Sequence, residues 1–407
     1  MAPGDALSRF SAWLLRPHMD LGPFHAGPLH CRAVEECWAS FSDALRPDFV
    51  PQRALPRGFR VQLANETSDA YAITDPRQLS RRLRTERWTQ LCAAIEGWRE
   101  LGCESRRRLA VLLHALSFYE TLRRLVCGLE ETEPEGELAY WRASAEYMLG
   151  APESISDYAD ADLRPFEHMA RHANGRTRFD AAAMVFVHRA KTGGATAELL
   201  RWQACLEEAL NAACRGVDDF AAGLYRSRFF RASGFLPQRL GDREGLRHTM
   251  DEAERYAVGL RPATSAEEHL YFENLHALME SRTKEALWLG DLDLALARAR
   301  RAIAADPNDS KVWVELGQVF MRRKEWQTAA GAYATAAMLG APAGAIGRQM
   351  AGVCLCRSGD ESIAALLFKD TAEIDPFGAS PLVAIDKLPQ DPAFEALKAW
   401  SRDSVRL

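Results

Sequence analysis

The stretch SKVWVELGQVFMRRKEWQTAAGAYATAAMLGAP, residues 310–342, decides the fold of this chain. Trp313, Leu316, Gly317 and Phe320 recur at i, i+3, i+4 and i+7, which is one stripe of a helix. An alanine-rich run that includes Ala329 follows it. Because Gly317 and Ala329 are small, we expect the two helices to pack closely as a pair.

Two further stretches repeat this pattern. Upstream, Gly290-Asp291 leads into an alanine-rich run that ends at Asp306-Pro307, and downstream Gly359-Asp360 leads into a run that ends at Asp375-Pro376. Gly290 to Gly359 spans two periods, one of 34 residues and one of 35. A period near 34 with small residues where two helices cross resembles the tetratricopeptide (TPR) repeat family. The resemblance is clear over residues 287–376, although Arg282 and Thr283 depart from the family pattern in the first copy.

The resemblance implies helix pairs that stack into a superhelix with a concave face, an architecture that usually binds a partner. We therefore expect an all-α fold in which a TPR-like superhelix spans 176–376. A mainly helical N-terminal domain of no assigned family (1–175) would precede it, and a capping helix would lie in 377–407. The exception to helix is 59–74, where apolar and polar residues alternate before a turn-rich segment, and this pattern predicts one short β-hairpin.

Helical periodicity covers most of the rest of the chain. The predicted helices upstream of the repeats are 5–15, 30–46, 77–101, 104–128, 135–149, 162–173, 179–191, 196–214, 218–238, 243–259 and 265–289. Gly241-Asp242 between two of them mimics the turn of a further, degenerate repeat.

Composition limits the classes of function. A net charge of −5 argues against non-specific binding to nucleic acid or to a membrane surface, and no long uncharged apolar run predicts a transmembrane helix. The nine cysteines are scattered without a CxxC pair, which favours reduced thiols, Cys354 and Cys356 among them, in a cytoplasmic protein. Of the 51 Lys and Arg residues 44 are Arg, a bias associated with GC-rich bacterial genomes. No motif predicts a cofactor.

The concave face is the first candidate site. The resemblance places it on the first helix of each repeat, where these positions carry seven cations against one acid, Glu280. The residues predicted to bind a peptide or partner are Arg228, Arg231, Arg239, Lys284, Trp288, Lys311, Gln318, Arg322, Gln349 and Arg357. Such a basic face with interleaved apolar residues suits an acidic segment of a peptide or protein.

Two other patterns have a chemical interpretation. His168 and His172 stand at i, i+4 and could share a metal ion, but most such pairs are solvated or satisfied by neighbours, so we expect no metal site here. Ser281 and Lys284 have the SxxK spacing of a serine nucleophile and its lysine base, without the companion motifs.

Two hypotheses for the function follow. The first is a protein- or peptide-binding TPR-like protein with a basic concave groove. The alternative is a bacterial peptide-modifying or natural-product biosynthesis enzyme whose TPR-like region holds the substrate peptide. A buried polar pocket formed by His114, Glu120, His168, His172 and His188 would favour the enzyme.

Overall fold

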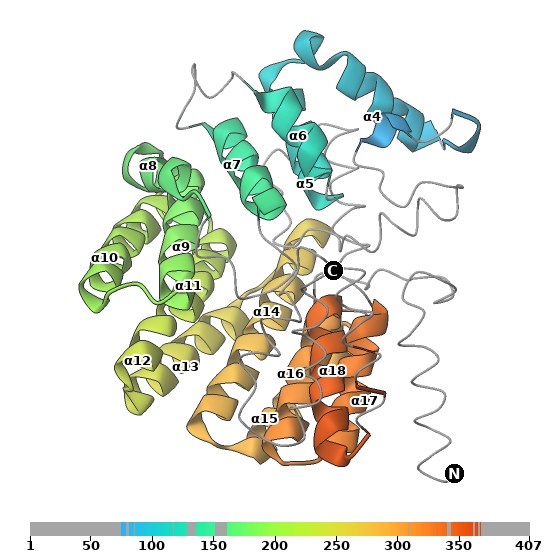
Figure 1. Cartoon of the computed structure of the whole chain (residues 1–407). Coiled ribbons are helices and arrows are strands. Elements are labelled where there is room, and N and C mark those ends of the chain that lie inside the picture. The colour runs from blue at the N-terminus through green and yellow to red at the C-terminus, as the bar shows by residue number, and fades with distance from the viewer. Residues whose placement is uncertain are drawn as a thin grey trace.

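The structure is a computed structural model that describes residues 75–78, 81–84, 86–116, 118–127, 136–150, 161–307, 309–339, 343–360, 363–364 and 367. All regular secondary structure within these residues is helical, which confirms the all-α prediction (Figure 1). The predicted helices at 5–15 and 30–46, the β-hairpin at 59–74 and the capping helix in 377–407 lie outside the described residues. Within the described part of the chain, no helix is both long and apolar enough to cross a membrane.

In the first part of the chain, the described residues form short 3₁₀ turns and seven α-helices. They are η1 (Pro76–Gln78), η2 (Arg81–Leu83), α4 (Glu86–Glu96), η3 (Trp98–Glu100), α5 (Cys103–Ala115), α6 (Tyr119–Val126), α7 (Glu137–Gly150), α8 (Arg164–His172), α9 (Gly175–Lys191) and α10 (Thr196–Ala213).

The second part forms the helices that shape the candidate site. They are α11 (Asp219–Ser233), α12 (Phe235–Leu240), α13 (Arg243–Gly259), α14 (Ser265–Leu289), α15 (Leu292–Ala305), α16 (Ser310–Arg322), α17 (Trp326–Leu339) and α18 (Gly344–Ser358).

The glycine-aspartate pairs end one helix and begin the next. Gly290 has φ of 81°, a left-handed conformation that costs a glycine little, and it closes the C-terminus of α14. The side chain of Asp291 then accepts a hydrogen bond from the backbone N–H of Leu294 and caps α15. Gly290 and Asp291 therefore form the turn that the sequence predicts between these two helices.

Three predicted helices are broken. The helix expected over 77–101 forms only α4, with 3₁₀ turns before and after it, and two others are each divided in two. The helix expected over 218–238 breaks between α11 and α12, because Pro237 has no N–H to donate and its ring would clash with the carbonyl of Ser233 in a continuous helix. The helix expected over 104–128 breaks after Ala115. Leu116, Phe118 and Tyr119 are all at most 3% exposed, and one straight helix could not turn all three side chains toward the same core.

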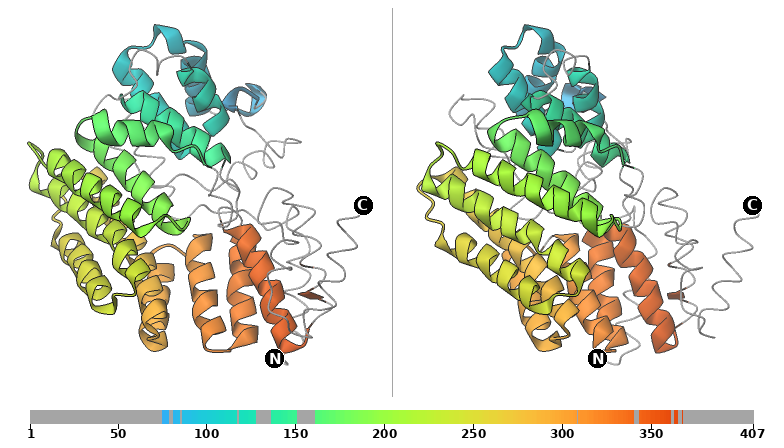
Figure 2. Two further views of the ribbon diagram at one scale, coloured as in Figure 1. Left: turned by 60° about the vertical axis from the view of Figure 1, so that its left-hand side comes forward. Right: turned by 90° about the vertical axis from the view of Figure 1, so that its left-hand side faces the viewer.

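The helices from α11 onward form a row. Helix α11 contacts α14, α14 contacts α16, and α16 contacts α18, while α13, α15 and α17 pack beside them. In Figure 1 the long helix α14 runs between α8–α13 and α15–α18. Figure 2 shows the orange and red helices of the last group standing side by side.

The core is a succession of local clusters between neighbouring helices. One cluster joins α4–α7, the next joins α7–α11, and a third joins α14–α18. Ala266, at the start of α14, belongs to the first of these clusters, whereas Ala286, near its end, belongs to the third. The boundary expected at residues 175 and 176 falls in the first turn of α9, which packs against α8 in the second cluster.

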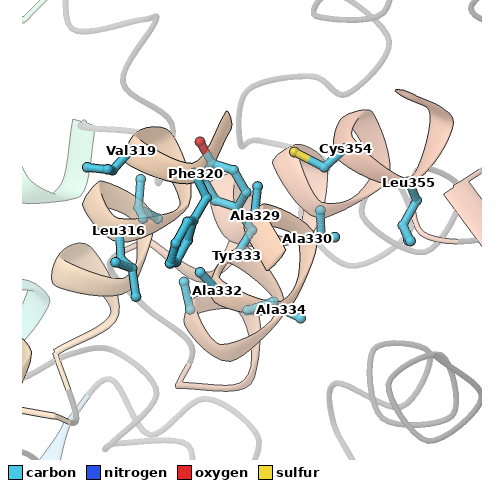
Figure 3. Packing of buried hydrophobic residues seen from close by; sticks show 14 of the residues in the cluster. Leu316, Val319, Phe320, Ala329, Ala330, Ala332, Tyr333, Ala334, Cys354 and Leu355 are labelled. Atoms are coloured by element: carbon cyan, nitrogen blue, oxygen red, sulfur yellow. The ribbon is translucent and has the colours of Figure 1, made fainter. Parts of the chain in front are cut away.

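The closest helix packing occurs around Tyr333, which is fully buried in the third cluster (Figure 3). A Cβ atom added to Gly317 would lie 2.8 Å from the Tyr333 ring, and one added to Gly347 would lie 2.7 Å from the Tyr333 carbonyl oxygen. Ala329 is also fully buried here. The prediction that Gly317 and Ala329 are buried where two helices cross is confirmed, and Gly347 extends this contact to α18.

We expect Gly317→Ala and Gly347→Ala each to lower the free energy of unfolding by about 1–3 kcal/mol, because the added methyl group overpacks the contact. Chemical denaturation followed by circular dichroism would measure the loss. The control is Gly259→Ala at the end of α13, where an added Cβ meets nothing within 4 Å. A loss for Gly259→Ala equal to that of the two variants would contradict the packing explanation.

Candidate functional site

A hollow lies among α11, α12, α13, α14 and α16. Its volume is about 300 Å³. The residues that line it are Arg231, Gly234, Phe235, Gln238, Leu246, Met250, Ser281, Lys284, Glu285, Leu287, Trp288, Gln318 and Arg322. The lining therefore combines three cations and two amides with aliphatic and aromatic side chains, and one carboxylate.

The hollow brings together half of the residues predicted for the concave face. Arg231 comes from α11, Lys284 and Trp288 from α14, and Gln318 and Arg322 from α16. Helices that are far apart in sequence thus contribute to one surface, as the repeat positions predict.

Five predicted residues do not line this hollow. Arg228 turns toward α9, where its guanidinium lies 2.8 Å from the Asp180 carboxylate and 5.5 Å from the centre of the Phe179 ring. Arg239 lies beyond the break at Gly234, so its position cannot be extrapolated from the turns of α11. The other three are Lys311, Gln349 and Arg357.

Lys284 forms an ion pair within the row of helices. Its ammonium lies 2.9 Å from Glu315 Oε1, and the Glu315 side chain is 7% exposed while that of Lys284 is 56% exposed. The Glu315 carboxylate raises the pKa of Lys284 above its usual value. Burial raises the pKa of Glu315, and the Lys284 ammonium offsets part of that rise.

Lys191, at the end of α9, is a cation that the sequence analysis missed. Its ammonium lies 5.7 Å from the centre of the Phe235 ring, a lining residue, in a cation–π contact. Enclosure by protein lowers the pKa of Lys191 to about 8, and repulsion by Lys284 and Lys311 adds to this effect. The side chain is nevertheless exposed, as expected for a residue that stands in a concavity open to water.

Polar side chains of α14 meet each neighbouring helix. Asn274 Nδ2 donates to Ser227 Oγ of α11 at 2.9 Å, and Ser227 in turn donates to the Ala253 carbonyl of α13 at 3.0 Å. Glu285 accepts hydrogen bonds from Arg282 on its own helix and from Arg298 of α15. These contacts set the position of α14 against α11, α13 and α15.

A histidine and two carboxylates meet where α14 contacts the start of α16. His276 Nε2 lies 3.0 Å from Asp309 Oδ2 and 3.6 Å from Glu280 Oε1. One ligand atom from each of the three residues lies within 4.8 Å of the other two. His276 and Asp309 are 1% exposed, whereas Glu280 is partly exposed. His276 and Glu280 share a helix face, but the approach of Asp309 depends on the packing of α16.

The histidine pair that the sequence suggested as metal ligands does not belong to this group on α14 and α16. His168 and His172 lie on an exposed face of α8, with ring centroids 4.7 Å apart. Among the described residues, they belong to no group of three metal-ligating side chains.

The described residues form neither of the two catalytic arrangements that the sequence suggested, the Ser281–Lys284 pair and the pocket that would include His114 and His188. Ser281 donates to the Ala277 carbonyl of its own helix, and the raised pKa of Lys284 is the opposite of what a lysine base requires. His114 bonds Ser144 between α5 and α7, whereas His188 lies against Tyr147 in the next cluster. Burial lowers the pKa of His114 to about 4, consistent with a neutral core histidine.

Cys354 and Cys356 are both buried in α18, and no disulfide joins them. Burial raises the pKa of Cys354 to about 12, so its thiolate is scarce at neutral pH. The expectation that these two cysteines form no disulfide with each other is confirmed.

No model of a known protein family matches this chain, and no curated protein matches it.

We expect Lys191 to react with a limiting amount of an amine-acylating reagent at a lower pH than Lys324, an exposed lysine in the turn after α16. The reason is that a pKa of about 8 leaves a larger neutral fraction at neutral pH. Peptide mass spectrometry across pH 6–10 would give the reactivity of each amine. Lys311→Gln should raise the pKa of Lys191, since it removes one repelling charge. Equal profiles for Lys191 and Lys324 would contradict the assignment.

We expect Ser227→Ala to lower the free energy of unfolding by about 1–3 kcal/mol, because it removes the partner of the buried Asn274 amide. Ser281→Ala is the matched control, since its hydroxyl donates to the Ala277 carbonyl of its own helix. Urea denaturation of both variants measures the difference. Similar stabilities would show that the contact between α11 and α14 does not depend on this hydrogen bond.

Proposed function

We propose that this chain is a TPR-like cytoplasmic protein that binds an acidic segment of a peptide or partner protein in the hollow among α11, α12, α14 and α16. The observation that carries the proposal is the mixed lining of that hollow. Arg231, Lys284 and Arg322 stand beside Phe235 and Trp288 around one space of about 300 Å³.

Each part of the lining has a separate role in this proposal. A space of about 300 Å³ is at the small end of ligand pockets, so it suits one or two apolar side chains and not a large cofactor. The surrounding guanidinium and ammonium groups would hold carboxylates on either side of that anchor by charge-assisted hydrogen bonds. Gln238 and Gln318 offer both donors and acceptors to a peptide backbone.

Electrostatics favours an acidic ligand. Lys191, Lys284 and Lys311 lie close enough to repel one another, and this repulsion helps to lower the pKa of Lys191. An anionic ligand would relieve that repulsion, so its binding should raise the pKa of Lys191. The whole chain carries a net charge of −5, so this local excess of cations is not a consequence of overall composition.

The family and the cellular setting rest on the sequence. The repeat of 34 and 35 residues supports a TPR-like assignment, and the free thiols among the described residues support a reducing compartment. The arginine bias supports a bacterial source. The enzyme alternative has less support, because its proposed polar residues lie in separate clusters.

The test is a variant in which Lys191, Lys311 and Arg322 are all replaced by Glu. These three side chains are exposed. Arg322 lines the hollow, Lys191 contacts its residue Phe235, and Lys311 lies close enough to Lys191 to repel it. Lys284 is kept because it balances the buried Glu315 carboxylate. The probes are two fluorescein-labelled peptides matched in length and apolar content, one rich in Glu and the other in Lys. We expect the wild type to prefer the Glu-rich peptide and the variant to lose at least about tenfold in affinity, since each exposed pair contributes up to about 1 kcal/mol.

The control reverses the same number of charges outside the hollow. Arg247 on α13 with Arg300 and Arg301 on α15 are exposed and do not line it, so Arg247→Glu, Arg300→Glu and Arg301→Glu should leave binding unchanged. Fluorescence anisotropy at low and high salt measures affinity, and binding should weaken with salt because charges are screened. Equal binding by a folded hollow variant and the wild type would refute the proposal.

A further inference from the structure

The contact between α14 and the start of α16 gathers metal-ligating atoms from two helices. His276 and Glu280 stand one helical turn apart, and Asp309 is the N-cap residue of α16. Asp309 Oδ1 accepts a hydrogen bond from the Lys311 backbone N–H at 3.1 Å, which leaves Oδ2 directed at His276. The cap therefore fixes the carboxylate in the orientation in which it meets the imidazole.

The separations between these atoms match those of ligands around one metal ion. First-row divalent ions bind imidazole nitrogen and carboxylate oxygen at about 2.0–2.2 Å, so ligand atoms at tetrahedral or octahedral angles lie about 3.0–3.5 Å apart. Here the imidazole nitrogen lies 3.0 Å from one carboxylate oxygen and 3.6 Å from the other. Small movements of the partly exposed Glu280 side chain would complete the geometry.

The charges of these three residues also favour a bound cation. One Nε2–H can donate at full strength to only one of the two carboxylates, whose oxygens lie within 4.8 Å of each other. Asp309 and His276 are almost fully buried, and charged groups in such surroundings are usually paired or coordinated to a metal. A divalent cation would attract both carboxylates and use the nitrogen lone pair of a neutral imidazole.

We propose that His276, Glu280 and Asp309 bind one divalent first-row metal ion, with Mn²⁺ or Zn²⁺ the best match to one nitrogen and two oxygen ligands. Three protein ligands leave coordination positions for water or an acidic group. Glu280 lies close enough to Lys191 and Lys284 to act on their charges, so the site borders the lysines of the hollow. The inference does not depend on peptide binding there.

The test uses Mn²⁺, because exposed cysteines such as Cys103 and Cys127 would bind Zn²⁺ through sulfur. The full chain, without a histidine tag, is stripped with a chelator and titrated with Mn²⁺ while electron paramagnetic resonance counts the free ion. We expect one saturable ion per chain and a rise in the thermal midpoint at saturation, because the folded state binds the ion.

The variants are chosen to preserve the fold. Glu280→Gln keeps the size of a partly exposed side chain, and Asp309→Asn keeps a residue that caps helices well. Each should weaken Mn²⁺ binding by about tenfold or more and reduce the thermal shift at a given Mn²⁺ concentration. Circular dichroism without metal checks folding. The control His168→Ala/His172→Ala removes the exposed histidine pair and should bind Mn²⁺ as the wild type does.

Two outcomes would overturn the inference. They are the absence of saturable Mn²⁺ binding and binding that folded Glu280→Gln retains in full. In the first case the three residues form only a hydrogen-bonded link between two helices. Peptide affinity measured with and without Mn²⁺ keeps this result separate from the proposed function.

Discussion

Helix α14 carries polar and charged side chains on several faces that its neighbours cover, and a buried polar group is costly unless it meets a partner. This constraint positions the surrounding helices. Asn274 meets Ser227 of α11, Glu285 meets Arg298 of α15, and His276 meets Asp309 at the start of α16. Because each of these contacts is directional, it fixes where one helix lies along another. Apolar packing alone would define that position less well. The hollow forms at the end of α14 because α11 and α16 are held in these registers.

On the other side of the row of helices, small residues provide a second constraint, because they allow the helices to pack closely. Tyr333 packs its ring on Gly317 of α16 and its backbone on Gly347 of α18, so three helices approach around one residue. A larger side chain at either glycine would push the helices apart. The contact of α14 with Asp309 acts at the start of α16, and the close packing of Tyr333 on Gly317 acts near its middle. Together they hold the inner surface that presents Gln318 and Arg322.

The two proposed sites share a boundary. Glu280 belongs to the candidate metal group, and its charge also acts on Lys191 and Lys284 beside the hollow. A metal ion at Glu280 would withdraw negative charge from the lysines and make this surface more favourable for an acidic segment. Binding of metal and of peptide would then be coupled through Glu280, with no change in helix packing required.

The sequence by itself determined most of the described helices, the glycine-aspartate turns between them and the small residues at their crossings, because periodicity, turn chemistry and side-chain size act over a few neighbouring residues. It also indicated Arg231, Lys284, Trp288, Gln318 and Arg322, since positions in a regular repeat recur on one face. Only the tertiary structure decided that Arg228 turns to Asp180, that Lys191 joins the cations, and that His276 meets Asp309. These contacts join helices far apart in the chain, and they depend on the break at Gly234 and on the angles at which whole helices pack. No local pattern encodes those angles.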